Sequence, residues 1–318
     1  MYCKGESKRG FASLINKFPF PSIKGKGIKR DRVTKNQMRN IKASTITQTV
    51  AQLCQQVNFI LGDDVLVALK QAQQTEESLL GREVLSLLLE NARIAKEEQL
   101  PLCQDCGMAV VFLEIGQEVH ITGGDLYAAV EEGVRQGYSQ GYLRKSIVSK
   151  PFSARINTRD NTPAVIHTEI VPGDRIKVTV MPKGAGAENM SKLAMLKPSD
   201  GRSGIIDLVV RTVDEAGGNP CPPVTIGLGI GGTSEKAMLM AKKTLLRPLA
   251  KPNPDPEIAE LEKEILGRVN DLGIGPLGFG GSTTALAVHA EVMPTHIASL
   301  PVAVNLQCHC ARHQEAVI

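Results

Sequence analysis

The sequence predicts an α/β protein in which a helical layer comes first and a mixed sheet with glycine-rich loops at one edge follows. Three observations predict this class. Apolar residues recur at helical spacing up to residue 98, strand-like and helix-like segments alternate after residue 107, and no internal repeat is found. Aromatic residues make up only 3% of the 318 residues, so aliphatic side chains must fill the core. We therefore expect one α/β domain over residues 38–318.

The first helices are predicted by capping residues and by the spacing of apolar side chains. Ser44 and Thr45 are typical helix caps, and apolar residues follow them at intervals of three and four. These apolar residues are Val50, Leu53, Cys54, Val57, Ile60 and Leu61. A second helix is expected after Asp63–Asp64, and a third from about Thr75 to Glu98. We expect Cys54 to belong to the core.

Strand-like runs begin after Pro101. The segments "MAVVFLEIG" and "EVHITGG" predict two strands, and Asp125 begins a helix over "DLYAAVEEGVRQGY". The segments "AVIHTEIV" and "RIKVTVMP" predict a hairpin that turns at residues 172–174. Further along, "PPVTIGLGIGG" predicts a strand that enters a loop, and "PVAVNLQ" predicts another strand. Helices are expected over "SGIIDLVVRTVDEAGG", "TSEKAMLMAKKTLL" and "EIAELEKEILGRVNDLG".

The basic character of the chain is confined to its N-terminal leader. Residues 1–37 carry ten lysines and arginines against two acidic residues, whereas the rest of the chain has a net charge of −4. Prolines in "FPFPS" interrupt any long amphipathic helix. We therefore expect a disordered extension, and Met38 is a plausible native start. No aromatic or base-reading pattern accompanies the lysines, so no nucleic-acid partner is expected. No apolar run approaches the ~20 residues of a membrane-spanning helix.

Seven cysteines without a secretory signal indicate a reducing compartment, so we expect a cytoplasmic protein. Cys103 and Cys106 precede a strand, and Cys221 lies among three prolines before another strand. Cys308 and Cys310 follow a third strand. Loops at one edge of a sheet would bring these cysteines together.

The cysteine spacing leaves three kinds of site open. A closed zinc site would use Cys103, Cys106, Cys308 and Cys310, but it leaves Cys221 without a role. A redox dithiol at C-x-x-C would be followed by a helix, whereas an apolar strand follows here. The third kind is one corner of an iron–sulfur site.

Glycine-rich segments suggest close backbone approach. Gly227–Gly232 matches G-x-G-x-x-G, the dinucleotide fingerprint. That motif also needs an acidic residue about 20 residues later at a strand end, and "RPLAKPNPDPE" is a poor strand. A nicotinamide-binding oxidoreductase is therefore disfavoured. We expect these glycines to admit another backbone or a small anion, and "KGAGAENMS" and "GPLGFGGST" to be similar loops.

Six motifs in order resemble one known family. They are "PLCQD-x-G", "KGAGAEN-x-S", "GGNPCPP", "IGLGIGGT", "THIASLPVAVN" and "QCH-x-AR". Together they resemble the α subunit of the iron–sulfur (class I) fumarate hydratases and its close relative, the L-tartrate dehydratase α subunit. The resemblance extends from about Met38 to Arg312.

The resemblance implies a [4Fe–4S] cluster held by Cys103, Cys221 and Cys308. Three thiolates leave one iron without a protein ligand, and that iron serves as a Lewis acid. Cys106 and Cys310 would then be bystanders. The resemblance also implies a catalytic pair, Asp105 and His296. The substrate-binding residues that it implies are Gln104, Arg144, Gly184, Gly186 and Asn189.

The implied reaction is the reversible dehydration of (S)-malate to fumarate. The alternative substrate is L(+)-tartrate, and a more remote alternative is a zinc-stabilised binding module without catalysis. The family's second domain is not in this sequence. We therefore expect a separate β subunit to complete the site, in an α2β2 assembly that acts on a small dicarboxylate.

Overall fold

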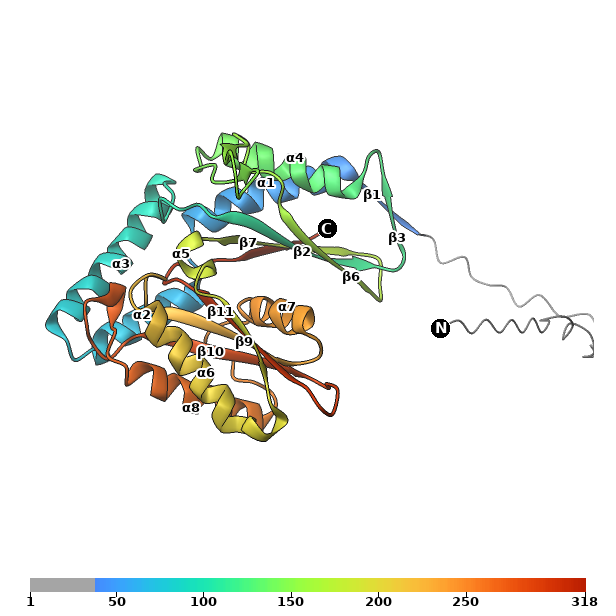
Figure 1. The fold of residues 1–318 in the computed structure, drawn as a ribbon. Helices are drawn as coiled ribbons and strands as arrows, with labels where there is room; N and C mark the ends of the chain where they lie inside the picture. Colours follow the sequence, from blue (N-terminus) through green and yellow to red (C-terminus); the bar gives the residue numbers. More distant parts are fainter. Residues whose placement is uncertain (1–37) are drawn as a thin grey trace, which may run out of the picture. The chain divides into compact units, whose positions relative to one another are not determined.

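Two four-stranded sheets position the residues of interest (Figure 1). The structure is a computed structural model and describes residues 38–318. The predicted leader and Cys3 lie outside the described residues. Met38–Ile318 forms one unit by its internal contacts. The predicted mixed α/β class is confirmed, although the strands form two large mixed sheets where one was expected.

Sheet 1 has the strand order β12-β7-β2-β6. Its strands are β2 (Met108–Gly116), β6 (Val165–Val171), β7 (Ile176–Lys183) and β12 (Gln314–Val317). β2 runs parallel to β6 and antiparallel to β7. The predicted hairpin between β6 and β7 is therefore wrong. β2 is buried along most of its length, and a central position pairs the backbone groups on both of its edges.

Helices α1 (Ala43–Phe59) and α4 (Leu126–Gln140) pack on one face of sheet 1. The Asp125 side chain accepts a hydrogen bond from the Ala128 N–H at 2.8 Å, which confirms the predicted start of α4. α1 begins at Ala43, so Ser44 and Thr45 lie in its first turn and do not cap it. Cys54 is fully buried in this core, as predicted.

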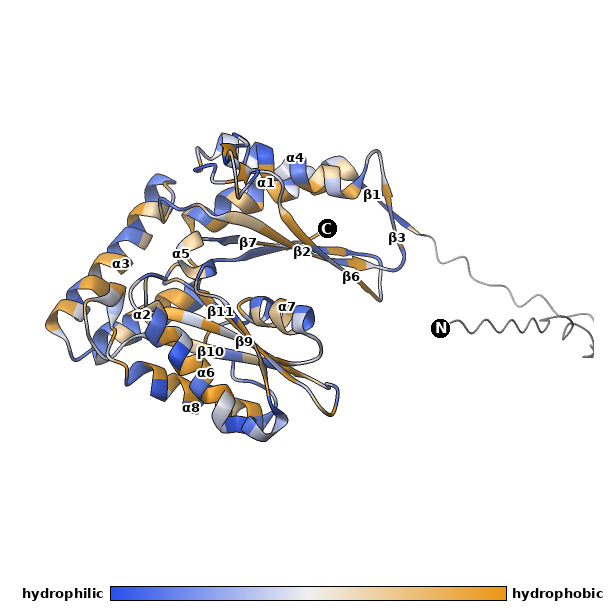
Figure 2. Ribbon diagram, in the orientation of Figure 1, coloured by the Kyte–Doolittle hydropathy of each residue, from blue (hydrophilic) through white to orange (hydrophobic). Residues whose placement is uncertain are grey.

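Sheet 2 has the order β10-β9-β11-β8. Its strands are β8 (Lys192–Leu196), β9 (Val224–Gly231), β10 (Ala285–Met293) and β11 (Leu300–Gln307). Helices α6 (Gly201–Ala216) and α8 (Pro256–Asn270) share one hydrophobic core with this sheet. α7 (Ser234–Thr244) lies against β9 and β11 with small residues, and the next residues, Leu245 and Leu246, pack against Phe112 of sheet 1. Figure 2 shows hydrophobic residues concentrated along β9.

All of the G-x-G-x-x-G segment except its last residue, Gly232, belongs to β9 and not to a loop after it. A Cβ atom at Gly227 would lie 2.0 Å from the Ala241 carbonyl oxygen, and one at Gly229 would lie 2.1 Å from that of Ala237. Both carbonyls belong to α7. These glycines therefore let a helix backbone approach the strand, which is the first of the two roles expected for them.

Gly227→Ala is expected to lower the free energy of unfolding by about 3 kcal/mol, because α7 must move to admit the methyl group. Denaturant midpoints would measure the change. Gly267→Ala, inside α8, is the matched control because a Cβ atom there meets nothing within 4 Å. Alanine is the better helix former, so the control gains about 0.5–1 kcal/mol. Equal stability of the Gly227 variant and the wild type would contradict the packing role.

The remaining elements are short or lie at the periphery. They are β1 (Arg39–Lys42), α2 (Asp63–Thr75), α3 (Leu79–Glu98), β3 (Val119–Thr122), β4 (Val148–Ser149), β5 (Ile156–Asn157), α5 (Ala185–Glu188) and the 3₁₀ turns Pro198–Asp200 and Pro276–Gly278. α3 begins at Leu79, later than predicted, because Ser78 caps it by accepting from the Gly81 N–H. Within residues 38–318, no helix is both long and apolar enough to cross a membrane.

The strand register brings several chain segments to one place. Met108 at the start of β2 pairs with Lys183 at the end of β7. In sheet 2, Thr225 near the start of β9 pairs with Gln307 at the end of β11. The buried Lys183 Nζ donates to the Leu306 carbonyl at 2.5 Å and so joins the two sheets. The loops before β2 and β9 and after β7 and β11 therefore meet.

Candidate functional site

Cys103, Cys221 and Cys308 come together at this meeting of loops. The Cys221 carbonyl accepts hydrogen bonds from the His309 backbone N–H and from its ring Nδ1, both at 3.1 Å. Cys103 and Cys308 pack against the same hydrophobic cluster, which includes Leu102 and Cys310. Burial and the neighbouring sulfur atoms of Cys308 and Cys103 raise the pKa of the Cys221 thiol. Three thiols in one place need a positively charged group before all of them can ionise.

The four cysteines of the zinc alternative do not converge on one metal position. Cys106 is buried in the core between sheet 1 and α1, where its Sγ accepts from the Arg144 N–H at 3.2 Å. Cys310 packs in a different cluster from Cys106, with residues of α2 and α3, and Cys103 and Cys308 border that same cluster. Across residues 38–318, no three His, Cys, Asp or Glu side chains converge tightly enough to hold one metal ion. A cluster spreads its ligands wider than one ion does, because each thiolate binds a different iron.

Arg312 places a buried positive charge beside the cysteines. Arg312 is 3% exposed, and its Nη2 donates to the Asp105 carbonyl at 2.6 Å. Burial disfavours the charge, but the nearby Cys310, Cys308 and Cys103 raise the pKa of the guanidinium. Its Nε and Nη1 have no hydrogen-bond partner among the described residues. A buried guanidinium with two of its three nitrogens unpartnered is costly. A cluster bound through three thiolates carries negative charge and would offset this cost, so the residues present fit such a group.

Asp105 is held by two backbone donors. Its Oδ1 accepts from the Gly107 N–H at 3.0 Å and its Oδ2 from the Ala185 N–H at 2.8 Å. The carboxylate thus bridges the cysteine loop and the glycine-rich loop after β7. Its position two residues from Cys103 and its partial burial suit a group that acts on a bound substrate.

Small residues let the loop after β7 contact both cysteine loops. A Cβ atom at Gly184 would lie 3.1 Å from Asp105 Oδ2, and one at Gly186 would lie 2.8 Å from the Asn219 carbonyl oxygen, two residues before Cys221. Asp105 and Asn189 both line a cavity of about 290 Å³. The structure therefore brings Asp105, Gly184, Gly186 and Asn189 together, as the resemblance implies.

Two lysines in this cavity were not among the predicted site residues. Lys183 and Lys242 line it together with Glu188. Lys183 Nζ lies 3.3 Å from Glu188 Oε2, and Lys242 also pairs with Glu188. Burial lowers the pKa of Lys183, and the two lysines hold the pKa of Glu188 below its ordinary value despite burial. Lys242 lies on α7, whose sequence gives no sign that it faces a site.

The other three predicted site residues lie in different surroundings. Gln104 is exposed beside Cys103, and Arg144 is an exposed residue whose backbone N–H contacts Cys106. His296 is in the loop before β11, whereas Cys308 follows the other end of that strand. His296 lines a separate cavity with Thr295 and Ile297. Eight strand residues separate the two ends by roughly 25 Å, so within this chain His296 is not beside the cysteines.

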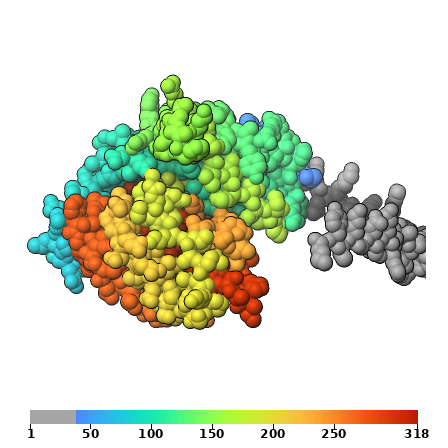
Figure 3. All heavy atoms as spheres, viewed as in Figure 1, coloured from blue at the N-terminus to red at the C-terminus, as the bar shows by residue number. Residues whose placement is uncertain are grey.

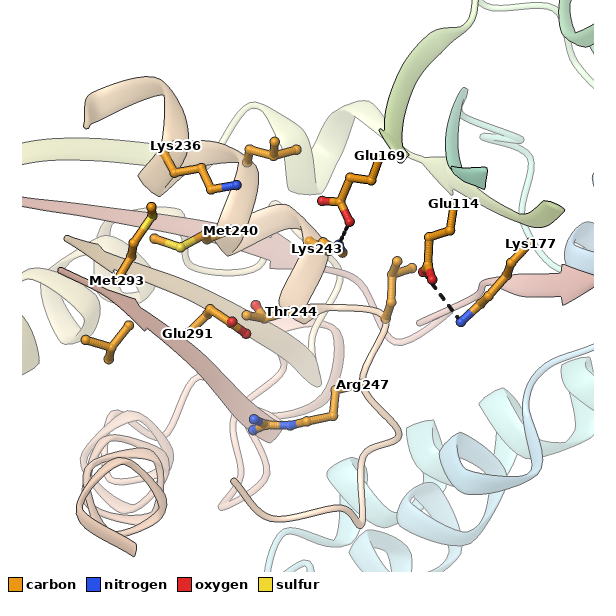
Figure 4. A pocket seen from close by; sticks show the side chains of 13 residues that line it. Glu114, Glu169, Lys177, Lys236, Met240, Lys243, Thr244, Arg247, Glu291 and Met293 are labelled. Carbon is orange, nitrogen blue, oxygen red and sulfur yellow. Dashed lines mark hydrogen bonds and ion pairs between the residues drawn. The ribbon is translucent and has the colours of Figure 1, made fainter. Parts of the chain in front are cut away.

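A second, charged cavity lies on the far side of α7, between that helix and sheet 1 (Figure 4). Its volume is about 490 Å³, and no cysteine lines it. Figure 4 shows Lys243 paired with Glu169 and Lys177 paired with Glu114 across it, at 2.7 and 3.8 Å. In both pairs a glutamate neutralises the lysine that it contacts.

Comparison with known proteins identifies the family. The family model described as fumarate hydratase (Fumerase) matches residues 47–317. The putative L(+)-tartrate dehydratase subunit alpha of Methanocaldococcus jannaschii is 42% identical over 272 residues, which cover 84% of this chain and 95% of that protein. The L(+)-tartrate dehydratase subunit alpha of Escherichia coli K12 is 30% identical over 271 residues, 84% of this chain and 88% of its own length. The alternative of a binding module without catalysis is therefore wrong. The chain belongs to the fumarate hydratase family and is a hydro-lyase subunit.

Proposed function

We propose that this chain is the α subunit of an iron–sulfur hydro-lyase that reversibly dehydrates (S)-malate to fumarate. The observation that carries the proposal is the convergence of Cys103, Cys221 and Cys308 beside the buried guanidinium of Arg312, whose Nε and Nη1 have no hydrogen-bond partner among residues 38–318. Three thiolate ligands suit a [4Fe–4S] cluster with one open iron. When bound, such a cluster supplies a Lewis acid that weakens the bond between carbon and the hydroxyl oxygen of a 2-hydroxy acid.

The chain's own residues would bind and orient the substrate. We assign carboxylate binding to Gln104, Arg144, Asn189 and the backbone of Gly184 and Gly186. Lys183 and Lys242 share a single carboxylate partner, Glu188, so these three side chains together contribute one positive charge to the cavity. Asp105 would orient or carry the proton lost from the carbon next to the hydroxyl-bearing carbon. The catalytic role implied for His296 remains a prediction.

The partner and the compartment also belong to the proposal. Relatives of this chain are named as subunit alpha, which supports a β subunit that completes the site, in an α2β2 assembly. All six cysteines of the described residues are free thiols, which suits the reducing cytoplasm.

L(+)-tartrate is the second candidate substrate, because the two relatives above are named as a putative L(+)-tartrate dehydratase subunit alpha and an L(+)-tartrate dehydratase subunit alpha. Malate and tartrate share two carboxylates, one hydroxyl that leaves and one proton that is removed. Tartrate carries a second hydroxyl on the carbon that loses the proton. Part of the pocket that distinguishes the two would lie on the β subunit.

Assaying both substrates side by side tests the proposal. The chain, reconstituted anaerobically with iron and sulfide and combined with the β subunit, is expected to form fumarate from (S)-malate. A higher kcat/KM for L(+)-tartrate would assign the second candidate. Exposure to air should abolish activity, because an iron without a protein ligand is readily oxidised and lost. Protein that stays colourless after reconstitution and dehydrates neither acid would refute the proposed iron–sulfur hydro-lyase.

A further inference from the structure

A basic loop with exposed apolar side chains adjoins the site. Residues 142–161, here called the basic loop, connect α4 to β6 and contain the short hairpin β4–β5 (Figure 1). In Figure 3 this segment forms the yellow-green projection at the top of the molecule. Phe152 is 95% exposed, Tyr142 is 91% exposed and Ile156 is 58% exposed. The basic loop thus exposes three large apolar side chains within 15 residues of sequence, and exposed apolar groups favour burial by a partner.

The positive charge of the basic loop has no ion-pair partner among residues 38–318. Its five cationic residues are Arg144, Lys145, Lys150, Arg155 and Arg159. Its one carboxylate, Asp160, pairs with Arg135 of α4 at 3.1 Å. None of the five cations forms an ion pair with any residue from 38 to 318. The basic loop thus has a net charge of +4, while the rest of residues 38–318 has a net charge of −8.

Internal hydrogen bonds hold the basic loop in one conformation. The fully buried Asn161 donates to the Gly107 carbonyl at 3.1 Å and accepts from the Ser146 N–H at 2.8 Å. Asn157 donates to the Lys145 carbonyl at 2.9 Å and accepts from the Arg159 N–H at 2.7 Å. These bonds leave the exposed side chains preorganised for contact, which lowers the entropy lost on binding.

The backbone of the basic loop is strained. Tyr142, Lys150, Arg155, Arg159 and Asn161 all have φ between 46° and 68°, a left-handed conformation that is unfavourable for residues with a Cβ atom. They are five of the eight non-glycine residues with positive φ in residues 38–318. Strain of this kind is concentrated at functional segments and persists where surrounding bonds fix the chain.

The base of the basic loop forms part of the candidate site. The Arg144 N–H contacts Cys106 Sγ, and Ser146 and Ile147 line the cavity that contains Asp105. Any subunit that completes this cavity must therefore reach the rim that the basic loop provides. Aromatic and arginine side chains are also the residues that most often anchor protein interfaces.

We propose that the basic loop is the docking surface for the β subunit. This inference rests on the proposed function, in which a β subunit completes the site. The β subunit would present an apolar pocket to Phe152 and an acidic rim to Lys150, Arg155 and Arg159. Docking there would fix the wall of the cavity formed by Ser146 and Ile147.

The test measures the affinity of the chain for the β subunit encoded in the same genome. Phe152→Ala and the double variant Lys150→Glu/Arg155→Glu are each expected to weaken association at least tenfold. The double variant should also reduce the dependence of affinity on salt. Matched controls are Ile170→Ala, which is 65% exposed on β6, and Lys70→Glu/Lys96→Glu on α2 and α3. Both controls should bind like the wild type. Iron and sulfide content of the isolated variants should be unchanged, which shows that they fold.

Several results would overturn this docking surface. Wild-type affinity in both loop variants is one, and failure of the wild-type chain to bind the β subunit is another. Charge reversal could leave affinity for the β subunit unchanged and instead abolish either self-association of the chain or its binding to a single-stranded RNA oligonucleotide. In that case the surface serves a different partner. If the loop variants lose the β subunit but the wild-type complex dehydrates neither malate nor tartrate, docking stands and the proposed reaction fails.

Discussion

Cys221→Ser is expected to release the iron–sulfur cluster and to lower kcat/KM by at least about 100-fold. Lewis-acid assistance by a metal is worth several kcal/mol, and each 1.36 kcal/mol is a factor of ten in rate. Serine keeps the backbone bonds of the loop, because the Cys221 N–H donates to the Gly218 carbonyl and its carbonyl accepts from His309. The loss would therefore come from the missing thiolate. Iron and sulfide analysis, together with visible absorption, measures it.

Cys106→Ser is the matched control for this experiment. Cys106 contacts backbone atoms of Cys103 and Arg144 and faces the core of sheet 1, so the variant should keep its iron. A zinc site of Cys103, Cys106, Cys308 and Cys310 predicts the opposite pair of outcomes. In that case Cys106→Ser loses metal and Cys221→Ser keeps it, and the cluster assignment would be wrong.

Asp105→Asn is expected to lower kcat by 10²- to 10⁴-fold, roughly the range for loss of a general acid or base, while the cluster is retained. The amide has one oxygen acceptor, so it can satisfy only one of the two donors that now hold the carboxylate, Gly107 N–H and Ala185 N–H. It also cannot accept the substrate's proton at neutral pH. Steady-state kinetics over a range of pH separates an effect on kcat from one on KM.

Asp125→Asn is the matched control, because it removes one carboxylate at the start of α4 and leaves the candidate site unchanged. Asp125 caps α4 by accepting from the Ala128 N–H, and asparagine caps helices equally well. Its activity should equal that of the wild type. A kcat within about twofold of the wild type for Asp105→Asn would exclude Asp105 from the proton transfer.

Local signals predicted much of the fold. The α4 cap at Asp125 and the strand character of β2, β9 and β11 follow from capping residues and apolar runs. The pairing of strands did not follow. β6 and β7 are adjacent in sequence with a turn between them, yet β2 lies between them. Which strand pairs with β6 and with β7 depends on which strand is buried on both faces. Tertiary packing decides that burial.

The family motifs name more of the candidate site residues than residue spacing and local composition do. The spacing of the cysteines alone left zinc, dithiol and cluster sites open, and only the fold separates Cys106 from Cys221 and Cys308. Arg312 carries no local signal of its burial. Glu76 is a similar case, because its buried carboxylate accepts from the backbone of Ser78, Ser282 and Thr283. Although burial opposes it, these bonds lower its pKa to about 2. Contacts between residues 200 positions apart leave no local pattern.

The placement of His296 could not be foreseen from sequence order. Its motif is continuous with that of Cys308, which suggests proximity. A strand lies between them, and an extended strand carries its two ends apart. Sequence order therefore does not show that His296 and Cys308 lie at opposite ends of β11.

Mössbauer spectroscopy of the anaerobically reconstituted protein with the β subunit, with and without (S)-malate or L(+)-tartrate, tests the central claim most directly. The three cysteines should leave one iron of the four distinct, and substrate should change the spectrum of that iron alone. Four equivalent irons that do not respond to either substrate, or a single mononuclear metal, would contradict the account.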